Sequence, residues 1–454
     1  MKKTFSIGGV HPDDCKFSQN CKIEVLPLPE TVYISMAQHL GAPATPIVAV
    51  GDKVKVGQVI AEPAGFISAF VHSSVSGTVK KIAPRKDLAG RDVMHIEIAV
   101  EGDEWMEGID LSDKLITAIP EDNKAILDKI KGNGVVGLGG ATFPTHVKLC
   151  PPPGKKAECL ILNGAECEPY LTSDYRIMLE RSKEIIIGAA IMKQVLGGCP
   201  AVIGIEDNKP EAIAKMSAAL AELQASAKGY EGITIQTLKK KYPQGGEKQL
   251  IDAVMKRQVK SMALPIDAGA VVQNVATSLA VYEAVQKNKP LVTNVLTVTG
   301  NTLPVEKQHN YLFRIGMPLS YIAEYAGGVP DDAAKIISGG PMMGKAIANL
   351  DATTVKGSSS LLYFTAEKTL RQPETACIRC GKCSEACPMG LEPFLLVKLA
   401  RNGMNAELED NAVQDCIECG CCLYSCPANI PLLDVIRMAK GDVIKIIRSR
   451  APKK

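Results

Sequence analysis

Nine of the fifteen cysteines in this 454-residue chain lie between residues 377 and 426, and they constrain the fold more than any other feature. They form two runs, CIRCGKCSEACP from Cys377 and CIECGCCLYSCP from Cys416, each with the spacing C-x2-C-x2-C-x3-C-P. Three thiolates at i, i+3 and i+6 can hold three corners of one [4Fe–4S] cluster, while the fourth cysteine reaches a second cluster. This part of the chain is therefore expected to fold around two neighbouring clusters.

The spacing assigns a ligand set to each predicted cluster. The first set is Cys377, Cys380, Cys383 and Cys426, and the second set is Cys416, Cys419, Cys422 and Cys387. Cys421 is left over, because only Cys422 keeps the spacing of the first run. Two structural zinc sites are the alternative, but zinc sites rarely use such a run twice over with a following proline.

Charge and hydropathy exclude several classes of partner. The 52 basic and 49 acidic residues give a net charge of +3, so nothing indicates nucleic acid binding. No apolar run approaches the roughly 20 residues that span a bilayer, and the N-terminus MKKTFSIGGVHPDD lacks the apolar region of a secretory signal. We expect a cytoplasmic polypeptide that reaches the membrane peripherally, through partner subunits. Cysteines in that compartment more often bind metals than form disulfides.

Two patterns precede the cysteine runs. Residues 45–100 are strand-like, and G-D-x-V-x-x-G-Q-x-I followed by S-G-x-V resembles the barrel-sandwich hybrid of biotinyl and lipoyl carriers. The hairpin region AGFISAFVHS has no lysine for a carrier group, so a structural or docking module is expected rather than a swinging arm. Residues 120–290 alternate helical and strand patterns, which is typical of an α/β domain.

Two stretches of that α/β domain indicate a ligand site. GVVGLGGATFPTHVK brings glycines at 134, 137, 139 and 140 close to Lys148, a composition that suits phosphate, although a plain tight turn would look the same. The buried strand in ECLILNGAECEPYLTSDYRIM ends at Asn163 and is followed by an acidic loop. Loops after strand ends are where α/β domains bind ligands, although a solvated acidic loop remains an alternative.

Together with YPQGGEKQLI at 242–251 and VVQNVATSLAV at 271–281, these stretches resemble the NADH-binding flavoprotein subunit of respiratory complex I. They resemble the RnfC subunit of the Rnf ion-translocating electron-transport complex more closely, over essentially the whole chain. The resemblance implies a multidomain α+β protein with four domains. These are a β barrel-sandwich hybrid domain (1–110), an α/β FMN/NADH-binding domain (111–290), a β-grasp, SLBB-like domain (291–365) and a helical two-cluster ferredoxin domain with a basic tail (366–454).

The resemblance also implies the cofactor-binding residues. Those expected to hold FMN are Gly137, Gly139, Gly140, Lys148, Asn163, Glu166, Gly246, Glu247 and Asn274. Phe143 is expected to stack on NADH and Glu168 to hydrogen-bond it, and no catalytic residue is expected beyond the cofactors. The chain departs from the complex I motif at Ala165, where that motif has Asp, at Lys248, where it has Glu, and at Gln273, where it has Asn.

The implied function is electron transfer by a subunit on the cytoplasmic face of the membrane. NAD(H) would exchange hydride with FMN, and FMN would exchange single electrons with two [4Fe–4S] clusters. Partner subunits would supply ferredoxin contact and Na+ or H+ translocation. One alternative is the cobalamin reductase of bacterial microcompartments, whose barrel-sandwich module lies at the C-terminal end, whereas here it is N-terminal. The other alternative is an iron–sulfur relay without flavin.

Overall fold

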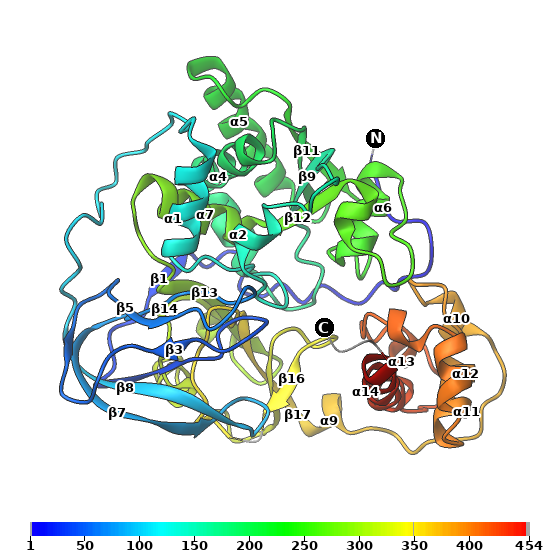
Figure 1. The fold of residues 1–454 in the computed structure, drawn as a ribbon. Coiled ribbons are helices and arrows are strands. Elements are labelled where there is room, and N and C mark those ends of the chain that lie inside the picture. The colour runs from blue at the N-terminus through cyan, green and yellow to red at the C-terminus, as the bar shows by residue number, and fades with distance from the viewer. Residues whose placement is uncertain (1, 348, 451–454) are drawn as a thin grey trace.

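The computed structural model describes residues 2–347 and 349–450. Figure 1 shows three β-containing domains and a separate helical domain near the C-terminus. The multidomain α+β architecture expected from the sequence is confirmed. In the part of the chain that the structure describes, no helix is both long and apolar enough to cross a membrane. The last four residues of the basic end KIIRSRAPKK lie outside the described residues.

The barrel-sandwich domain is built from two small antiparallel sheets. Their strands are β2 (Thr31–Ser35), β3 (Thr45–Pro46), β4 (Lys53–Val54), β5 (Val59–Glu62), β6 (Val71–His72), β7 (Ser76–Lys86) and β8 (Asp92–Gly102). The sheet orders are β2-β8-β7-β4 and β3-β5-β6. Alternating Val and Ile side chains close one core between them, including Ile34, Ile60 and Ile96.

Residues before the barrel-sandwich domain form an arm that joins the other domains. Strand β1 (Ile23–Val25) pairs in parallel with β14 (His309–Arg314). Nearer the N-terminus, Lys3 forms a bridge to Leu238 and Val10 forms one to Tyr242. The expected domain 1–110 therefore contains an arm, residues 2–25, that packs outside the barrel-sandwich core.

The α/β domain has a four-stranded, fully parallel sheet of order β11-β10-β9-β12. The strands are β9 (Cys159–Gly164), β10 (Ala201–Glu206), β11 (Ile233–Leu238) and β12 (Ala270–Asn274). Strands β9, β10 and β11 proceed in one direction across the sheet, and β12 returns to the other side of β9. The strand order therefore reverses between β9 and β12, which is where parallel α/β sheets bind ligands at the strands' carboxyl ends.

Helices pack on this sheet and bury its apolar strands (Figure 1). They are α1 (Asn123–Gly132), α2 (Thr145–Lys148), α3 (Ser173–Glu180), α4 (Ser182–Val195), α5 (Pro210–Ser226), α6 (Glu247–Met255) and α7 (Val275–Gln286). Helix α4 crosses α7 closely at Gly188, where an added Cβ would lie 1.9 Å from the carbonyl oxygen of Ser278. A glycine is required there by this close approach.

The β-grasp domain is a six-stranded mixed sheet of order β1-β14-β13-β17-β15-β16. Its remaining elements are β13 (Thr293–Gly300), α8 (Leu319–Tyr325), β15 (Ala333–Ser338), β16 (Lys345–Ile347) and β17 (Ser360–Thr365). One apolar core runs without a break from the α/β domain into this sheet and includes Tyr175, Phe313 and Tyr363. The two domains are therefore packed as one body.

The cysteine-rich domain is helical, as the sequence predicted. It contains α10 (Lys382–Glu385), α11 (Pro393–Arg401), α12 (Asn405–Asp410), α13 (Cys421–Tyr424) and α14 (Leu432–Arg450), whereas α9 (Ala366–Thr369) packs on the β-grasp strands β15 and β17. Leucine and isoleucine side chains from α11, α12 and α14 form its core, and several cysteines pack at the edge of that core. Each cysteine run begins in a loop and continues through the short helix that follows it, α10 in the first run and α13 in the second.

Candidate cofactor sites

The predicted flavin residues Asn163 and Asn274 meet at the point where the strand order reverses. They are register partners at the carboxyl ends of β9 and β12. The side-chain nitrogen of Asn274 donates to Asp174 at 2.7 Å, and its side-chain oxygen accepts from the amide of Ala276 at 2.7 Å, which caps helix α7. Two residues 111 positions apart are therefore fixed side by side where a ligand is expected.

The glycine-rich loop lies directly against Asn274. A Cβ added at Gly139 would lie 2.6 Å from the side-chain nitrogen of Asn274, so this approach requires glycine. Gly140 faces open space, with no atom within 4 Å of an added Cβ. The loop is closed by a hydrogen bond of 2.9 Å from the amide of Gly137 to the carbonyl of Phe143. The structure thus brings the loop and the two asparagines together.

The segment YPQGGE closes the other side of the site. The side-chain nitrogen of Asn163 donates to the carbonyl of Gly245 at 2.9 Å. Lys148 forms an ion pair of 2.6 Å with Glu247 at the start of α6, immediately after Gly246, which is the N-cap of that helix. Lys148 and Glu247, both predicted FMN residues, therefore neutralise each other in this structure.

Two buried side-chain amides, next in sequence to Gly245 and Asn274, have nitrogens without partners. The Nε2 atoms of Gln244 and Gln273 have no hydrogen-bond partner among the described residues. Leaving such donors unsatisfied in a dry interior is costly, about 1–3 kcal/mol each. An anionic cofactor that forms hydrogen bonds, such as FMN, fits this set of residues. It comprises two unpaired amide donors, a glycine-rich loop that faces open space at Gly140, and Lys148.

Glu166, in the acidic loop after β9, bonds to the start of the helix that follows the loop. The Glu166 carboxylate accepts from the amides of Asp174 at 2.7 Å and Tyr175 at 3.2 Å, the first turn of α3. Burial raises the pKa of Glu166 to about 7. Its backbone φ of 46° lies in the left-handed region, which non-glycine residues rarely adopt. Both of these carboxylate hydrogen bonds go to helix α3, so the structure gives this predicted FMN residue a helix-capping role.

Sequence reasoning missed Lys16, which holds this loop in place. Its ammonium group donates to the carbonyls of Glu166, Glu168 and Leu171 at 2.9, 2.8 and 2.6 Å. Burial lowers the pKa of Lys16 to about 8. No local pattern around position 16 signals this role, because the partners are 150 to 155 residues away.

The two predicted NADH residues lie in different surroundings. Phe143 is half-buried in the glycine-rich loop. The Glu168 carboxylate instead accepts from the amides of Met342 at 3.0 Å and Met343 at 2.9 Å, in a turn of the β-grasp domain. Burial raises the pKa of Glu168 to about 7. In this structure Glu168 therefore joins two domains.

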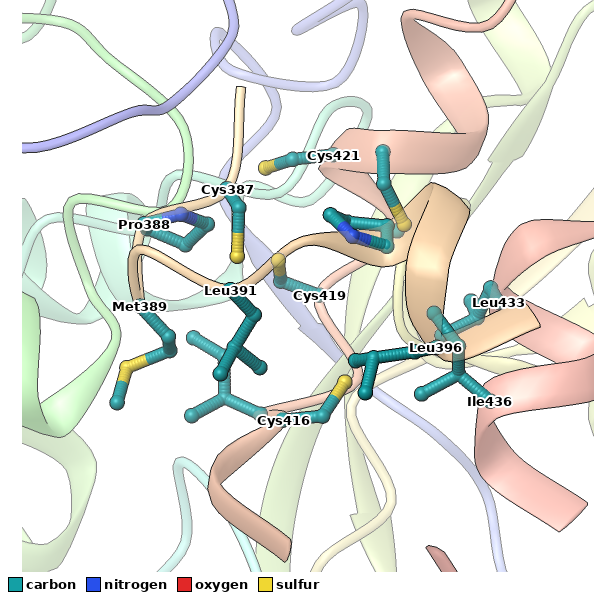
Figure 2. A pocket seen from close by; sticks show the side chains of 14 residues that line it. Cys387, Pro388, Met389, Leu391, Leu396, Cys416, Cys419, Cys421, Leu433 and Ile436 are labelled. Atoms are coloured by element: carbon teal, nitrogen blue, oxygen red, sulfur yellow. The ribbon is translucent and has the colours of Figure 1, made fainter. Parts of the chain in front are cut away.

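The predicted second-cluster ligands surround one cavity. It is lined by Cys387 from the first run together with Cys416, Cys419 and Cys422 from the second, and by Cys421. Figure 2 shows the sulfur atoms of Cys387 and Cys419 pointing into the same space, among apolar side chains such as Leu391 and Leu396. The fold thus brings Cys387 to the second run, as the crossed ligand assignment requires.

The two cysteine loops repeat the same backbone. Arg379 and Glu418 have φ of 57° and 58°, and the following Gly381 and Gly420 have φ of 76° and 79° and start helices α10 and α13. In each loop one cysteine separates the two left-handed positions, so the chain turns at the same places in both. The duplication predicted from the spacing is therefore also a duplication in three dimensions.

The predicted first-cluster ligands are less enclosed. Cys377 and Cys380 are exposed, whereas Cys383 and Cys426 are half-buried against the helical core. Throughout residues 2–347 and 349–450, no three histidine, cysteine or carboxylate side chains converge closely enough to hold a single metal ion.

The flavin-side domain and the cysteine-rich domain are joined by polar contacts. The hydroxyl of Tyr242 donates to the carbonyl of Cys419 at 2.9 Å. The side-chain amide of Gln249 donates to the carbonyl of Pro388 at 3.1 Å. Lys248 lies 3.8 Å from Asp415, immediately before Cys416. Lys248, where the complex I motif has Glu, thus forms an ion pair with Asp415 beside the second cysteine loop.

Four family models match this chain in the order of its domains. They are the RnfC barrel sandwich hybrid domain (3–104), the Nuo51 FMN-binding domain (130–283), the SLBB domain (295–346) and the 4Fe-4S dicluster domain (369–427). The chain is also similar in fold to a NAD+-reducing [NiFe]-hydrogenase in the H2-reduced state. That structure has a TM-score of 0.51 and 18% identity, and the match covers 74% of this chain and 62% of the other.

Two curated relatives match nearly full length. The C subunit of the proton-translocating ferredoxin:NAD(+) oxidoreductase complex of Clostridium ljungdahlii is 45% identical, over 90% of this chain and 87% of its own length. The C subunit of the Na(+)-translocating complex of Acetobacterium woodii is 41% identical, over 96% of each chain. On this similarity, the chain belongs to the RnfC family, the C subunits of ion-translocating, Rnf-type oxidoreductase complexes.

Proposed function

We propose that this chain is the electron-transfer subunit of a membrane ferredoxin:NAD+ oxidoreductase complex. It binds FMN at the strand reversal, exchanges hydride with NAD(H) there, and carries two [4Fe–4S] clusters in the cysteine-rich domain. Partner subunits connect it to ferredoxin and to Na+ or H+ translocation. The chain lies on the cytoplasmic face of the membrane and is held there by those subunits. The printed names of the relatives support the complex and its overall reaction.

One observation carries this proposal. The segment 242–247 contacts both candidate cofactor sites: its Gly245 carbonyl accepts from Asn163 at the flavin site, and its Tyr242 hydroxyl donates to Cys419 at the second cluster. Two sites that exchange electrons must lie close to each other. A short segment that contacts both supports direct transfer between them.

The residues of the flavin site would bind and orient FMN. Gly139 and Gly140 leave room for close approach of the phosphate to backbone amides, and Lys148 offers positive charge. The spare amides of Gln244 and Gln273 can donate to the cofactor. When bound, FMN supplies the exchange between the two-electron hydride of NADH and one-electron carriers.

The cysteine residues would supply thiolate ligands to the clusters. Burial raises the pKa of Cys416 to about 11, so this thiol is protonated at neutral pH until a metal binds and displaces the proton. The apolar side chains around Cys387 would exclude water from a cluster held there, and solvent exposure and hydrogen bonding are among the factors that set the potential of such a cluster. The exposed first loop gives the first cluster a wetter environment.

A content measurement on anaerobically purified protein tests the cofactor assignment. The proposal expects one FMN and about eight iron and eight acid-labile sulfide atoms per chain, from two four-iron clusters. Zinc without sulfide would contradict the clusters. Full iron content with no extractable flavin would instead identify an iron–sulfur relay that uses the α/β domain as a scaffold.

A further inference from the structure

The two cysteine loops, residues 377–387 and 416–426, have left-handed residues at the same positions, but their first halves, 377–382 and 416–421, differ in what covers them. Their equivalent positions are Ile378 with Ile417, Gly381 with Gly420, and Lys382 with Cys421. Each chain therefore contains an internal comparison. The second loop shows which contacts this backbone makes when other parts of the chain cover it. The first loop shows which residues the same backbone exposes without that cover.

The second loop is covered by the rest of the chain. Ile417 and Cys421 belong to one apolar cluster with Val10 and Tyr242. A Cβ added at Gly420 would lie 3.2 Å from the carbonyl oxygen of Met342 in the β-grasp domain. The covering surface thus contacts the loop at the isoleucine, the glycine and the residue that follows it.

The first loop presents the same three positions to solvent. Ile378 is 68% exposed, and nothing lies within 4 Å of a Cβ added at Gly381. Lys382 and the neighbouring Arg379 are exposed, and neither has an ion-pair partner in the described part of the chain. The equivalent of Arg379 in the second loop, Glu418, instead pairs with cations of helix α14. The first loop therefore exposes an uncovered apolar residue, Ile378, followed along the chain by two cations without ion-pair partners among the described residues.

We propose, on the basis of the proposed function, that the first loop is the docking face for a partner protein that carries a one-electron cofactor behind an acidic surface. Ile378 would enter an apolar contact on the partner, as Ile417 does within this chain. Arg379 and Lys382 would face carboxylates, because complementary charge steers encounter and fixes orientation. Redox encounters commonly use small interfaces, below about 1,200 Å² in total, which one loop and its surroundings can supply.

The step at this face transfers an electron and no atoms. One electron would pass between the first cluster, held by the predicted thiolate ligands, and the partner's cofactor. One of the two would be oxidised as the other is reduced, and no bond would form or break. The second cluster, enclosed against Tyr242, is then the inner carrier next to the flavin site. The first cluster, whose ligands Cys377 and Cys380 are exposed, is the outer carrier.

Lysine footprinting of the assembled membrane complex tests the location of this face. In the isolated chain, both Lys382 and Lys215 of helix α5 should react with an acetylating reagent, since both are exposed. In the complex, the labelling of Lys382 should fall at least tenfold while that of Lys215 remains. Carbodiimide should then link Lys382 to a carboxylate of a partner protein that holds a redox cofactor. Equal labelling of Lys382 in both samples would overturn the proposal, as would protection without any such link.

A charge reversal tests whether the face works in electron transfer. The double variant Arg379→Glu/Lys382→Glu should slow transfer between the chain and its partner subunits about tenfold at low salt. It should also reverse the sign of the salt dependence of that rate, because salt then screens a repulsion instead of an attraction. Flavin bleaching and both cluster EPR signals should not change. The matched control is Lys215→Glu/Lys228→Glu on an exposed region of the α/β domain, which should transfer normally.

The outcomes separate the two proposals. Normal cluster signals with an unchanged transfer rate in Arg379→Glu/Lys382→Glu would overturn the docking face alone. Absence of cluster signals from the unmodified chain would overturn the proposed function, whatever the footprint shows.

Discussion

The buried hydroxyl of Tyr242 donates a 2.9 Å hydrogen bond to the backbone carbonyl of Cys419. This bond connects the segment that closes the flavin site to a predicted ligand of the second cluster. Glu168 lies 3.5 Å from the same hydroxyl and holds the Met342–Met343 turn, which packs on the same loop. The second cysteine loop is thus positioned by residues from both the α/β and the β-grasp domains.

Tyr242→Phe should lower the reduction potential of the second cluster and leave the first unchanged. The positive end of the O–H dipole points toward the cluster loop and favours the more negative, reduced cluster, so its loss favours oxidation. The measurement is an EPR-monitored redox titration of the second cluster in a Cys380→Ala background, in which only that cluster should remain. The first cluster is titrated in the same way in a Cys416→Ala background.

Tyr325→Phe is the matched control, because the hydroxyl of Tyr325 donates to Glu24, far from the cysteines. It should leave both potentials unchanged. Loss of all iron and flavin in Tyr242→Phe, or an unchanged potential, would contradict the role given to this hydroxyl.

Lys148→Ala should weaken FMN binding about tenfold or more without reducing the iron content. A hydrogen bond to a charged group contributes roughly 1.5–3 kcal/mol, whereas the partly exposed Lys148–Glu247 ion pair contributes under about 1 kcal/mol to stability. Flavin release measured by fluorescence tests this. Lys155→Ala removes a comparable pair with Asp267 in the same domain and should retain FMN. Joint loss of flavin and iron in Lys148→Ala would indicate a folding defect and remove Lys148 from the site.

Cys421→Ala should keep both clusters, whereas Cys422→Ala should lose the second. Cys421 is fully buried, and its sulfur lies 4.0 Å from the carbonyl of Tyr242, outside the repeated spacing. Iron and sulfide content with EPR of the reduced protein distinguishes the two variants. The reverse pattern would transfer the ligand role from Cys422 to Cys421.

A buried lysine gives a pH-dependent prediction. The ammonium group of Lys356 donates to the carbonyls of Phe70 and Gly134, just before the glycine-rich loop, and burial lowers its pKa to about 7. An unfolded lysine titrates near 10.5, so between pH 7 and 10.5 the unfolded state binds more protons than the folded state. The contribution of Lys356 to the free energy of unfolding therefore increases as pH rises through this window. Below pH 7 the lysine is charged in both the folded and the unfolded state, so its effect on stability no longer changes with pH.

Lys356→Met removes this dependence. From pH 7 to pH 9, the free energy of unfolding of the unmodified chain should increase relative to the variant by up to about 3 kcal/mol. Urea unfolding followed by fluorescence of the only tryptophan, Trp105, reports on the adjacent barrel-sandwich domain. A stability difference that is the same at both pH values would show that Lys356 is not neutral in the folded protein.

The sequence predicted those features that depend on local spacing. The repeated cysteine runs indicated two equivalent loops, and the structure shows the same pair of left-handed residues in each. The Val- and Ile-rich segments predicted the barrel-sandwich and parallel strands because strand periodicity is local. The position of Asn163 after a buried strand correctly indicated the carboxyl edge of the sheet.

Features that depend on distant contacts were not predictable from one sequence. Nothing near Lys16 indicates that its ammonium group binds three carbonyls of the acidic loop. The local sequence predicts Glu168 to be a free carboxylate beside a ligand site. In the structure, however, this carboxylate accepts hydrogen bonds from two amides in a turn of the β-grasp domain. Strand β1 pairs with residues near 310, far along the chain, so no local pattern could place it there.

Anaerobic titration of the purified, cofactor-replete chain with NADH tests the central claim most directly. We predict that NADH bleaches the visible absorption band of the flavin and that an EPR signal of reduced clusters follows as more NADH is added. Full reduction would take up to about two NADH per chain, because FMN accepts two electrons and each of two clusters accepts one. In Cys416→Ala, which removes a ligand of the inner cluster, bleaching should persist while onward transfer to a one-electron acceptor is lost. Failure of NADH to bleach the flavin, in protein whose clusters dithionite reduces normally, would contradict the account.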